Sequence, residues 1–211
     1  MAIFTIGHST HSEEEFIELL GEISTVVDIR SHPASKWAQF RRENLERWLP
    51  AAGKRYIWMR GLGGWRSGYG EQREALARRG VDPAMRRETG DESGWKNAGL
   101  RDYAYFQTTD EFRDAVAELI AMGEKEDVAI MCAEARWWKC HRSMVSDYLL
   151  FHGIDSTHIM RPGSAPSARK SHRDVIGSRL DRYPREVLAD WERRRKDPSS
   201  PLPPTPSLSE S

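Results

Sequence analysis

The chain has 211 residues, a mass of 24.2 kDa and a formal net charge of +0, with 32 basic and 32 acidic side chains. This length suits one domain, or one domain with an appendage, and the charge balance neither favours nor excludes a nucleic-acid partner. No window approaches the roughly 18 apolar residues that a membrane span needs, so we expect no membrane partner. With two cysteines and no signal peptide, the sequence predicts a cytoplasmic protein with reduced thiols rather than a disulfide-rich secreted one.

The N-terminal segment predicts a strand, a helix and a second strand. Residues 3–6 form an apolar run that stops at Gly7-His8-Ser9-Thr10. Ser12 and Glu15 then form a capping box, and the apolar stripe of the helix that follows comprises Phe16, Leu19, Leu20 and Ile23. Residues 26–30 are the second strand, and this spacing predicts a right-handed parallel crossover.

A second helix is predicted in residues 41–53 and a third strand in residues 56–59. Gly61-Leu62-Gly63-Gly64 follows, and its glycines are equally compatible with a phosphate cradle and with a tight turn. Residues 65–107 form a long insert, rich in Arg and aromatic residues, with poor periodicity. Such a segment predicts a functional lid, a binding loop or disorder, and the aromatic residues favour an ordered loop.

The pattern becomes regular again at Thr108 and Glu111, which predict another capping box. A buried strand is expected at residues 128–132, a helix from His141 or just after it, and a last short strand at residues 156–160. Alternation of strands and helices predicts an α/β fold, a single three-layer domain with a mainly parallel sheet.

Three segments follow from this pattern. The α/β core covers residues 1–160 and includes the insert at 65–107. Residues 161–196 form a basic C-terminal extension with one helix, carrying eleven basic and five acidic side chains. This extension could steer a polyanion or could simply be a solvated surface. The Pro- and Ser-rich tail, residues 197–211, is predicted to be disordered.

Functional groups are densest between the strand at 128–132 and the following helix, where ligands are usually held in α/β sheets. Cys132 could be a nucleophile if nearby cations lowered its pKa, but the residue six positions later is Trp138 rather than the Arg of a phosphatase loop. Cys140 lies eight positions from Cys132, and without a C-x-x-C pair this is no standard zinc site. We therefore expect structural thiols, no metal and no cofactor.

Carboxylates, cations and indoles remain as candidates. Asp28 and Glu134 could divide acid and base roles in one cleft, or each could pair with an Arg nearby: Asp28 with Arg30 or Arg142, Glu134 with Arg136. Arg142 opposes the dipole at a helix start, so an anion or carboxylate partner is expected for it. Trp137 and Trp138 cannot both easily enter one core, which favours a stacking platform for a planar ligand.

The chain resembles the domain-of-unknown-function 488 family over roughly its first 160 residues. The resemblance is carried by Gly7-His8-Ser9-Thr10, by Val27-Asp28-Ile29-Arg30 with Pro33 and Phe40, by Leu62-Gly63-Gly64, and by Cys132-Ala133-Glu134 with Cys140-His141-Arg142. Gly94-Trp95-Lys96-Asn97, Arg101-Asp102-Tyr103 and the Trp pair are similar to a subgroup with the signature C-A-E-A-x-W-W-x-C-H-R. The resemblance implies an α/β fold whose marked residues meet at one cleft.

For this subgroup the resemblance implies excision of methylated adenine from DNA, by base flipping and hydrolysis of the N-glycosidic bond. Glu134 or Asp28 would then stabilise the sugar cation or activate water, and His8, His141 or an Arg-bound network would protonate the departing base. The expected substrate-binding residues are Arg30, Ser31, Trp95, Asn97, Tyr103, Trp137, Trp138 and Arg142.

Two alternatives stay open at this stage. One is a thiol enzyme with Cys132 as nucleophile on a small anionic substrate, and the other is a non-catalytic module that binds nucleotides or nucleic acid. Apart from DNA, the sequence identifies no partner.

Overall fold

The computed structural model describes residues 2–64, 95, 97–160, 169–177 and 179–197. Within them lies one six-stranded sheet with the order β3-β2-β4-β1-β5-β6. All neighbouring strands are parallel except β5 and β6, which are antiparallel. The strands are β1 (Ile3–Gly7), β2 (Thr25–Asp28), β3 (Arg55–Trp58), β4 (Val128–Cys132), β5 (Ser156–Ile159) and β6 (Arg169–Ser171). The mainly parallel α/β sheet predicted from sequence is confirmed.

Helices cover both faces of this sheet. The longer ones are α1 (Glu13–Leu20), α2 (Arg42–Ala51), α5 (Ala98–Phe106), α6 (Asp110–Gly123), α7 (Arg142–Phe151) and α9 (Arg185–Lys196). The short ones are α8 (His172–Val175) and the single turns η1 (Ala38–Phe40), η2 (Arg60–Leu62), η3 (Trp137–Lys139) and η4 (Arg179–Arg182). Among the described residues, none of these helices is long and apolar enough to span a membrane.

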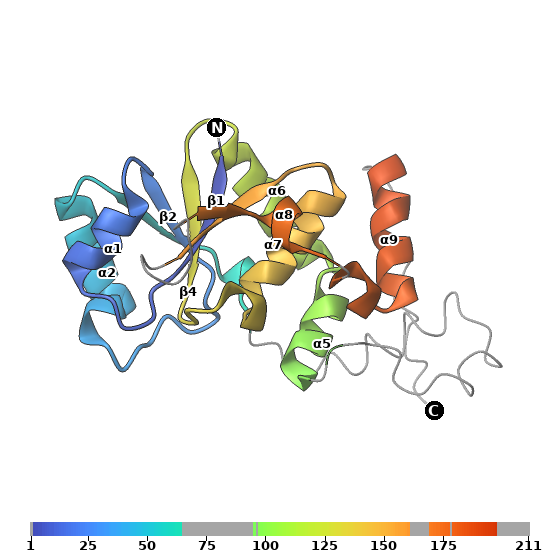
Figure 1. Cartoon of the computed structure of the whole chain (residues 1–211), viewed down its shortest axis with the longest axis horizontal. Coiled ribbons are helices and arrows are strands. Elements are labelled where there is room, and N and C mark those ends of the chain that lie inside the picture. The colour runs from blue at the N-terminus through green and yellow to red at the C-terminus, as the bar shows by residue number, and fades with distance from the viewer. Residues whose placement is uncertain (1, 65–94, 96, 161–168, 178, 198–211) are drawn as a thin grey trace, which may run out of the picture.

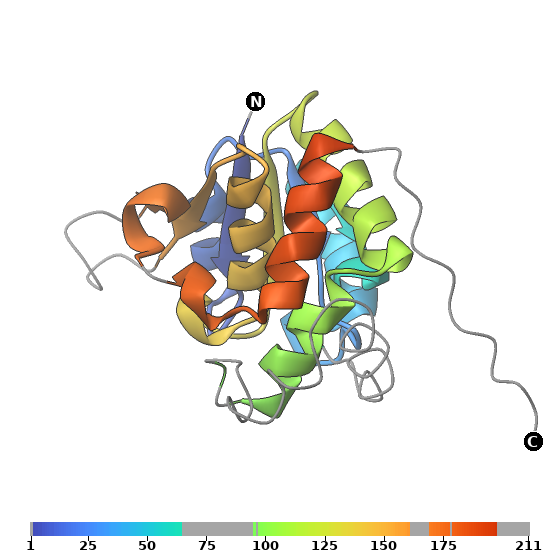
Figure 2. The same ribbon diagram turned by 90° about the vertical axis from the view of Figure 1, so that its right-hand side faces the viewer.

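Apolar side chains form two separate clusters, one on each face of the sheet, so the fold has three layers: helices, sheet and helices. Phe16 and Leu20 of α1 and Leu45 of α2 pack on one face of the sheet. Val116 of α6 and Met144 of α7 belong to the cluster on the other face, together with Trp191 of α9. Figure 1 shows α1 and α2 on one side of the strands, with α6, α7 and α9 on the other, and Figure 2 looks onto this second layer. Alternate residues of the central strands therefore enter different clusters.

The helix starts test the predicted capping boxes. At α1 the box is present, because the Ser12 side chain accepts from Glu15 N–H while the Glu15 carboxylate accepts from Ser12 N–H. At α6 the prediction was wrong by one residue. Thr109, rather than Thr108, accepts from the backbone N–H of Phe112, whereas the Thr108 hydroxyl donates to the Tyr105 carbonyl. Two adjacent threonines offer the same hydroxyl, and only the backbone path decides between them.

Two predicted segments differ from the structure. The last part of the supposed insert, residues 98–106, is helix α5, with Tyr103 and Phe106 buried in the core. Periodicity missed it because its last four residues, 103–106, are all buried and show no alternation of polar and apolar side chains. Residues 65–94 and 96 of the insert lie outside the described residues.

The segment after β5 is more than a basic extension with one helix. It contributes β6, α8 and η4 in addition to α9, and the Trp191 side chain of α9 is fully buried. Arg193 and Arg194 pair with Asp190, and Arg195 pairs with Glu192. Lys196 also pairs with Glu192, so four cations share two carboxylates and the end of α9 keeps a net positive charge. The polyanion-binding role considered above stays a prediction. Residues 161–168 and 198–211, and with them nearly all of the predicted disordered tail, lie outside the described residues.

The strand order places one switch point at the centre of the sheet. β4 lies between β1 and β2, and the chain leaves β1 towards α1 on one face but leaves β4 towards α7 on the other. In open α/β sheets such a point, at the carboxyl ends of the strands, is where ligands bind. The segments that follow β1, β2 and β4 are therefore expected to form a ligand-binding site.

Candidate active site

The segments after β1 and β4 lie side by side. His8 N–H donates to the Cys132 carbonyl at 2.8 Å, and Ser9 N–H donates to the Ala133 carbonyl at 3.0 Å. Gly7 permits this approach, because a Cβ at that position would lie 2.1 Å from the Glu134 carbonyl oxygen. Ser9 has φ +45°, a conformation that is rare outside glycine and that clusters at functional sites. The turn after β1 is thus fixed against the β4–α7 loop, residues 133–141.

The carboxylate of Asp28 is fully buried and already occupied. Arg30 donates to it from Nε at 2.8 Å and from Nη2 at 2.6 Å, and the Tyr56 hydroxyl donates at 2.8 Å. Burial, followed by the charge of Asp28, raises the pKa of Tyr56, which keeps that hydroxyl a donor. Of the two partners considered from sequence, Asp28 takes Arg30 and not Arg142. An enclosed, fully bonded carboxylate orients its guanidinium partner and has little capacity left for a substrate.

His8 lies beside this ion pair and is held neutral. Burial and the adjacent charge of Arg30 lower its pKa from 6.5 to about 4. Its Nε2 faces Nη1 of Arg30 at 3.3 Å, its Nδ1 faces the Ser9 carbonyl at 3.1 Å, and its ring stacks on Phe40 at 4.4 Å. Because Nε2 faces a donor and Nδ1 faces an acceptor, the ring carries its proton on Nδ1. A neutral imidazole of this kind is a poor general acid near pH 7.

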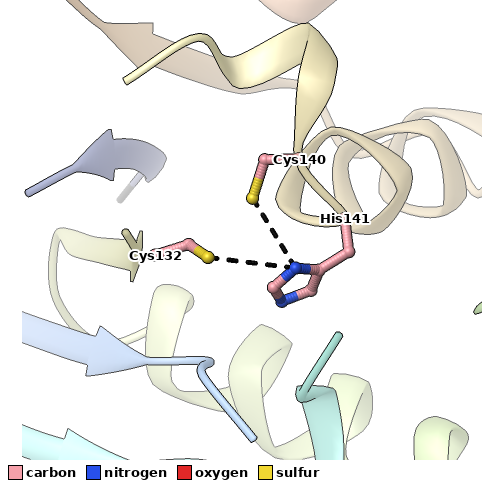
Figure 3. A group of neighbouring side chains, drawn as sticks. All are labelled: Cys132, Cys140 and His141. Carbon is pink, nitrogen blue, oxygen red and sulfur yellow. Dashed lines mark hydrogen bonds between the residues drawn. The ribbon is translucent and has the colours of Figure 1, made fainter. Parts of the chain in front are cut away.

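On the other side of β4, two thiols meet one imidazole. The sulfur of Cys132 lies 3.9 Å and that of Cys140 3.6 Å from Nδ1 of His141 (Figure 3). The Nε2 of His141 lies 2.9 Å from the Ile29 carbonyl, which can only accept, so Nε2 carries the proton and Nδ1 has a free lone pair. A hydrogen bond from Cys140 holds the pKa of Cys132 well below its ordinary value, whereas burial raises the pKa of Cys140.

Arg142 is buried at the start of α7, and its side chain turns back on the β4–α7 loop. Its Nη2 donates to the carbonyl of Glu134 at 2.6 Å and to that of Ala135 at 3.2 Å. Its Nε and Nη1 are buried and have no hydrogen-bond partner within the described part of the chain. Unsatisfied buried donors are costly, so an anion or water is expected there. The anion partner expected from sequence is therefore not a carboxylate of the described chain.

The β4–α7 loop presents a distinct set of groups to solvent. Glu134, Arg136, Trp138 and Lys139 are exposed, whereas Trp137 between them is buried. The Glu134 carboxylate accepts only from the backbone N–H of Arg136, at 3.2 Å, among the described groups, so the expected pairing with the Arg136 guanidinium is not formed. An exposed carboxylate, two cations and a 46 % exposed indole thus share one short segment.

The two tryptophans have different surroundings. Trp137 stacks on His158 with ring centroids 4.0 Å apart and planes at 6°, and its edge meets Trp138. Its ring is therefore used inside the protein, where Arg179 also lies over it. Trp138 is the exposed indole of the pair. The expectation that both indoles cannot enter one core agrees with this division, but a platform of two indoles is not present.

Several other predicted binding residues point elsewhere. Trp95 is buried against Tyr183, with Arg179 and Arg182 over its ring. Tyr103 is fully buried, and its hydroxyl donates to the Leu62 carbonyl at 2.8 Å. Asn97 is exposed but caps α5 by accepting from Leu100 N–H. Ser31 lies against Gly63, where a Cβ would be 2.5 Å from its hydroxyl, so that glycine serves close packing.

The structure also contains a polar network that sequence reasoning did not identify. Thr5, His158, His172 and Asp147 form a continuous chain of contacts of 2.7 to 2.9 Å beneath Trp137. Asp147 also accepts from Arg179 and from Tyr183. Burial alone would raise the pKa of Asp147, yet the hydrogen bond from His172 and the charge of Arg179 hold it below its ordinary value. These residues come from β1, α7, β5, α8 and the segment 179–183, and no local pattern links them.

A comparison with protein families found one family model that matches the chain. The model described as "Domain of unknown function DUF488" matches residues 14–149, which include β2, β3, β4 and the whole β4–α7 loop. No curated protein and no solved structure matched the chain.

Proposed function

The chain belongs to the DUF488 family, and from its exposed β4–α7 loop we propose that it is a DNA-acting hydrolase that excises N6-methylated adenine. One observation carries this proposal. Glu134, Arg136, Trp138 and Lys139 are exposed together at the switch point of the sheet, on a loop whose carbonyls are held by Arg142. The combination of cations and an exposed aromatic ring is typical of surfaces that bind single-stranded or flipped nucleotides.

The roles of the loop residues follow from their chemistry. Arg136 and Lys139 contact phosphates, and the ring of Trp138 stacks on a base that has left the duplex. Glu134 takes a proton from water, the water oxygen bonds to C1′ of the sugar, and the bond from C1′ to N9 of the base breaks. The electron pair of the broken bond leaves with the base, and the base then receives the proton that Glu134 took from water. Before it takes this proton, the ionised carboxylate of Glu134 stabilises the positive charge that develops on the sugar.

The remaining candidates take supporting roles in this proposal. Asp28 is a positioning residue, because it fixes Arg30, whose Nη1 donates to the Phe40 carbonyl at 2.9 Å beneath the His8 ring. Arg142 positions Glu134 through the loop carbonyls, and its two unpartnered donors favour an anionic ligand nearby. We place the enzyme in the cytoplasm, where thiols such as Cys132 and Cys140, both free here, stay reduced.

The thiol-enzyme alternative gains less from the geometry. The lowered pKa of the Cys132 thiol favours it as a nucleophile. However, Cys132 is only 8 % exposed and Cys140 only 5 %, so a substrate has little access to either sulfur. The non-catalytic binding module is compatible with the same exposed loop. It is separated from the proposed hydrolase by whether the bound DNA changes.

The test is release of free base. The full chain is incubated with duplex and single-stranded oligonucleotides containing N6-methyladenine, and released base and abasic sites are quantified. Glu134→Gln is expected to lower the rate by about 100-fold or more, since a general base contributes about 10²–10⁴. Glu18→Gln, an exposed carboxylate on α1, is the matched control and should keep the wild-type rate. Absence of base release from every oligonucleotide overturns the proposed reaction.

Binding is tested separately from the reaction. Replacing both Arg136 and Lys139 with alanine should weaken DNA binding. It should also make the slope of log affinity against log salt shallower, by the amount expected for the loss of about two phosphate contacts. The double variant of Arg195 and Lys196, which are paired with Glu192 on α9, is the control for the loss of two surface charges. Tight binding with no base release would favour the binding module instead.

A further inference from the structure

We propose that Cys132, Cys140 and His141 form a binding site for one Zn²⁺ ion, with a fourth position left for an exogenous ligand. Spacing along the chain argued against zinc, because the two cysteines are not in a C-x-x-C pair. The fold nevertheless brings the three side chains together. Cys132 ends β4, Cys140 follows η3, and His141 directly precedes α7 (Figure 3).

The distances between the three ligand atoms fit a tetrahedral metal. Zinc–sulfur bonds of about 2.3 Å and zinc–nitrogen bonds of about 2.0–2.1 Å, at a tetrahedral angle, place sulfur and nitrogen about 3.6 Å apart. Here Nδ1 of His141 lies 3.6 Å from the sulfur of Cys140 and 3.9 Å from that of Cys132. All three ligand atoms lie within 4.8 Å of one another. The two sulfur–nitrogen distances therefore agree with the tetrahedral value to within a few tenths of an ångström.

The imidazole is prepared as a ligand. Its Nε2–H is fixed by the Ile29 carbonyl at 2.9 Å, so Nδ1 presents a lone pair to the two sulfurs. Histidines that bind metal almost always donate their other ring N–H to an oxygen in this way. The single lone pair of Nδ1 can accept one thiol proton, but two sulfurs converge on it. A shared cation accounts for both sulfurs.

The surroundings hold this geometry. The edge of the His141 ring packs against Tyr103 with centroids 5.1 Å apart, and Gly64 lies so close that a Cβ would be 2.2 Å from Nδ1. Cys132 and Cys140 are both buried. A ligand set held rigidly by packing is what a metal site requires, and two thiolates with one imidazole suit zinc among the common metals.

The composition of the site indicates its class. Structural zinc sites have four protein ligands, whereas three protein ligands with an open position are typical of sites that bind water or substrate. Among the described residues, the group contains three ligands. Arg142, directly after His141, is buried and retains unpartnered Nε and Nη1 donors. Its charge favours an anion, such as hydroxide, at the fourth position.

Metal content is the test. The full-length protein is produced with added zinc, dialysed against buffer without chelator and analysed by mass spectrometry for metals. Wild-type protein is expected to hold about one zinc ion per chain, and Cys132→Ser, Cys140→Ser and His141→Gln about a tenth of that or less. His152→Gln changes a histidine outside the cluster and should retain the ion, as should Glu134→Gln. Because Glu134→Gln loses base release but keeps zinc, this test does not depend on the proposed reaction.

A second measurement uses the wild-type protein alone, in case the ligand variants fail to fold. Adding Co²⁺ to metal-free protein should give the intense visible bands of tetrahedral cobalt and a thiolate-to-cobalt charge-transfer band, and Zn²⁺ should abolish both. Wild-type protein that holds no metal and gives no cobalt–thiolate band overturns the proposal. So does protein isolated with a disulfide between Cys132 and Cys140 that still binds no metal after reduction.

Discussion

Arg30 binds the carboxylate of Asp28, two residues before it, through two side-chain nitrogens and its own backbone N–H, and the pair is buried. Removing one partner of a buried ion pair costs about 3–5 kcal/mol, because the other charge stays buried without compensation. We therefore expect Asp28→Asn to lower the free energy of unfolding by this amount, measured by urea denaturation. Glu46→Gln, in the exposed pair with Arg42, should change it by less than about 1 kcal/mol. An Asp28→Asn protein as stable as the wild type would contradict the expected cost of leaving the Arg30 charge buried without its partner.

The different positions of the adjacent tryptophans predict opposite phenotypes. Trp137→Ala removes a buried ring stacked on His158 and should cost about 3–5 kcal/mol of stability. Trp138→Ala should leave stability within about 1 kcal/mol but weaken binding of single-stranded DNA by about 1–3 kcal/mol. Thermal unfolding and fluorescence titration measure the two effects. Equal losses of binding in both variants, with both proteins folded, would contradict the stacking role of Trp138.

Two buried histidines predict how stability depends on pH. Burial lowers the pKa of His158 from 6.5 to about 2, and that of His8 to about 4. Between about pH 4 and 6.5 the unfolded chain therefore binds more protons than the folded chain, and stability should fall as the pH falls. His158→Gln should reduce this slope by about one proton, or about 1.4 kcal/mol per pH unit.

The control for this slope is His32→Gln, which replaces an exposed histidine and should leave it unchanged. Urea denaturation at several pH values in the same range provides the measurement. An unaltered slope in folded His158→Gln would show that His158 is protonated inside the protein.

The turn after β1 carries strain at one position. Ser9 adopts φ +45°, which costs an L-residue more than it costs glycine. Ser9→Gly is expected to raise the free energy of unfolding by about 0.5–1 kcal/mol, since it keeps the N–H that donates to the Ala133 carbonyl. Thr10→Gly, next to it and outside the left-handed region, should lower stability instead. Denaturant unfolding of both variants measures whether Ser9→Gly raises and Thr10→Gly lowers the free energy of unfolding.

Local sequence determined most of the strands and helices of this protein, although not α5, β6 or α8, and the edge of the sheet at which its polar groups gather. Apolar runs predicted β1, β2 and β4 because buried strands require them, and Ser12 with Glu15 marked the start of α1. The start of α7 was predicted within one residue, since the apolar helical pattern resumes directly after His141. These features depend on neighbours within a few positions, which the sequence displays.

Tertiary structure alone decided which groups meet and which remain exposed. Asp28 and Glu134 look alike in the sequence, but Tyr56 and Arg30 enclose the first while the second stays in solvent. Trp137 is buried and Trp138 is not because His158, on a different strand, takes one ring face. Likewise, Cys132, Cys140 and His141 form a ligand set only because β4 and α7 meet beside the Ile29 carbonyl. Burial and metal geometry depend on contacts across the sheet, so no local pattern could predict them.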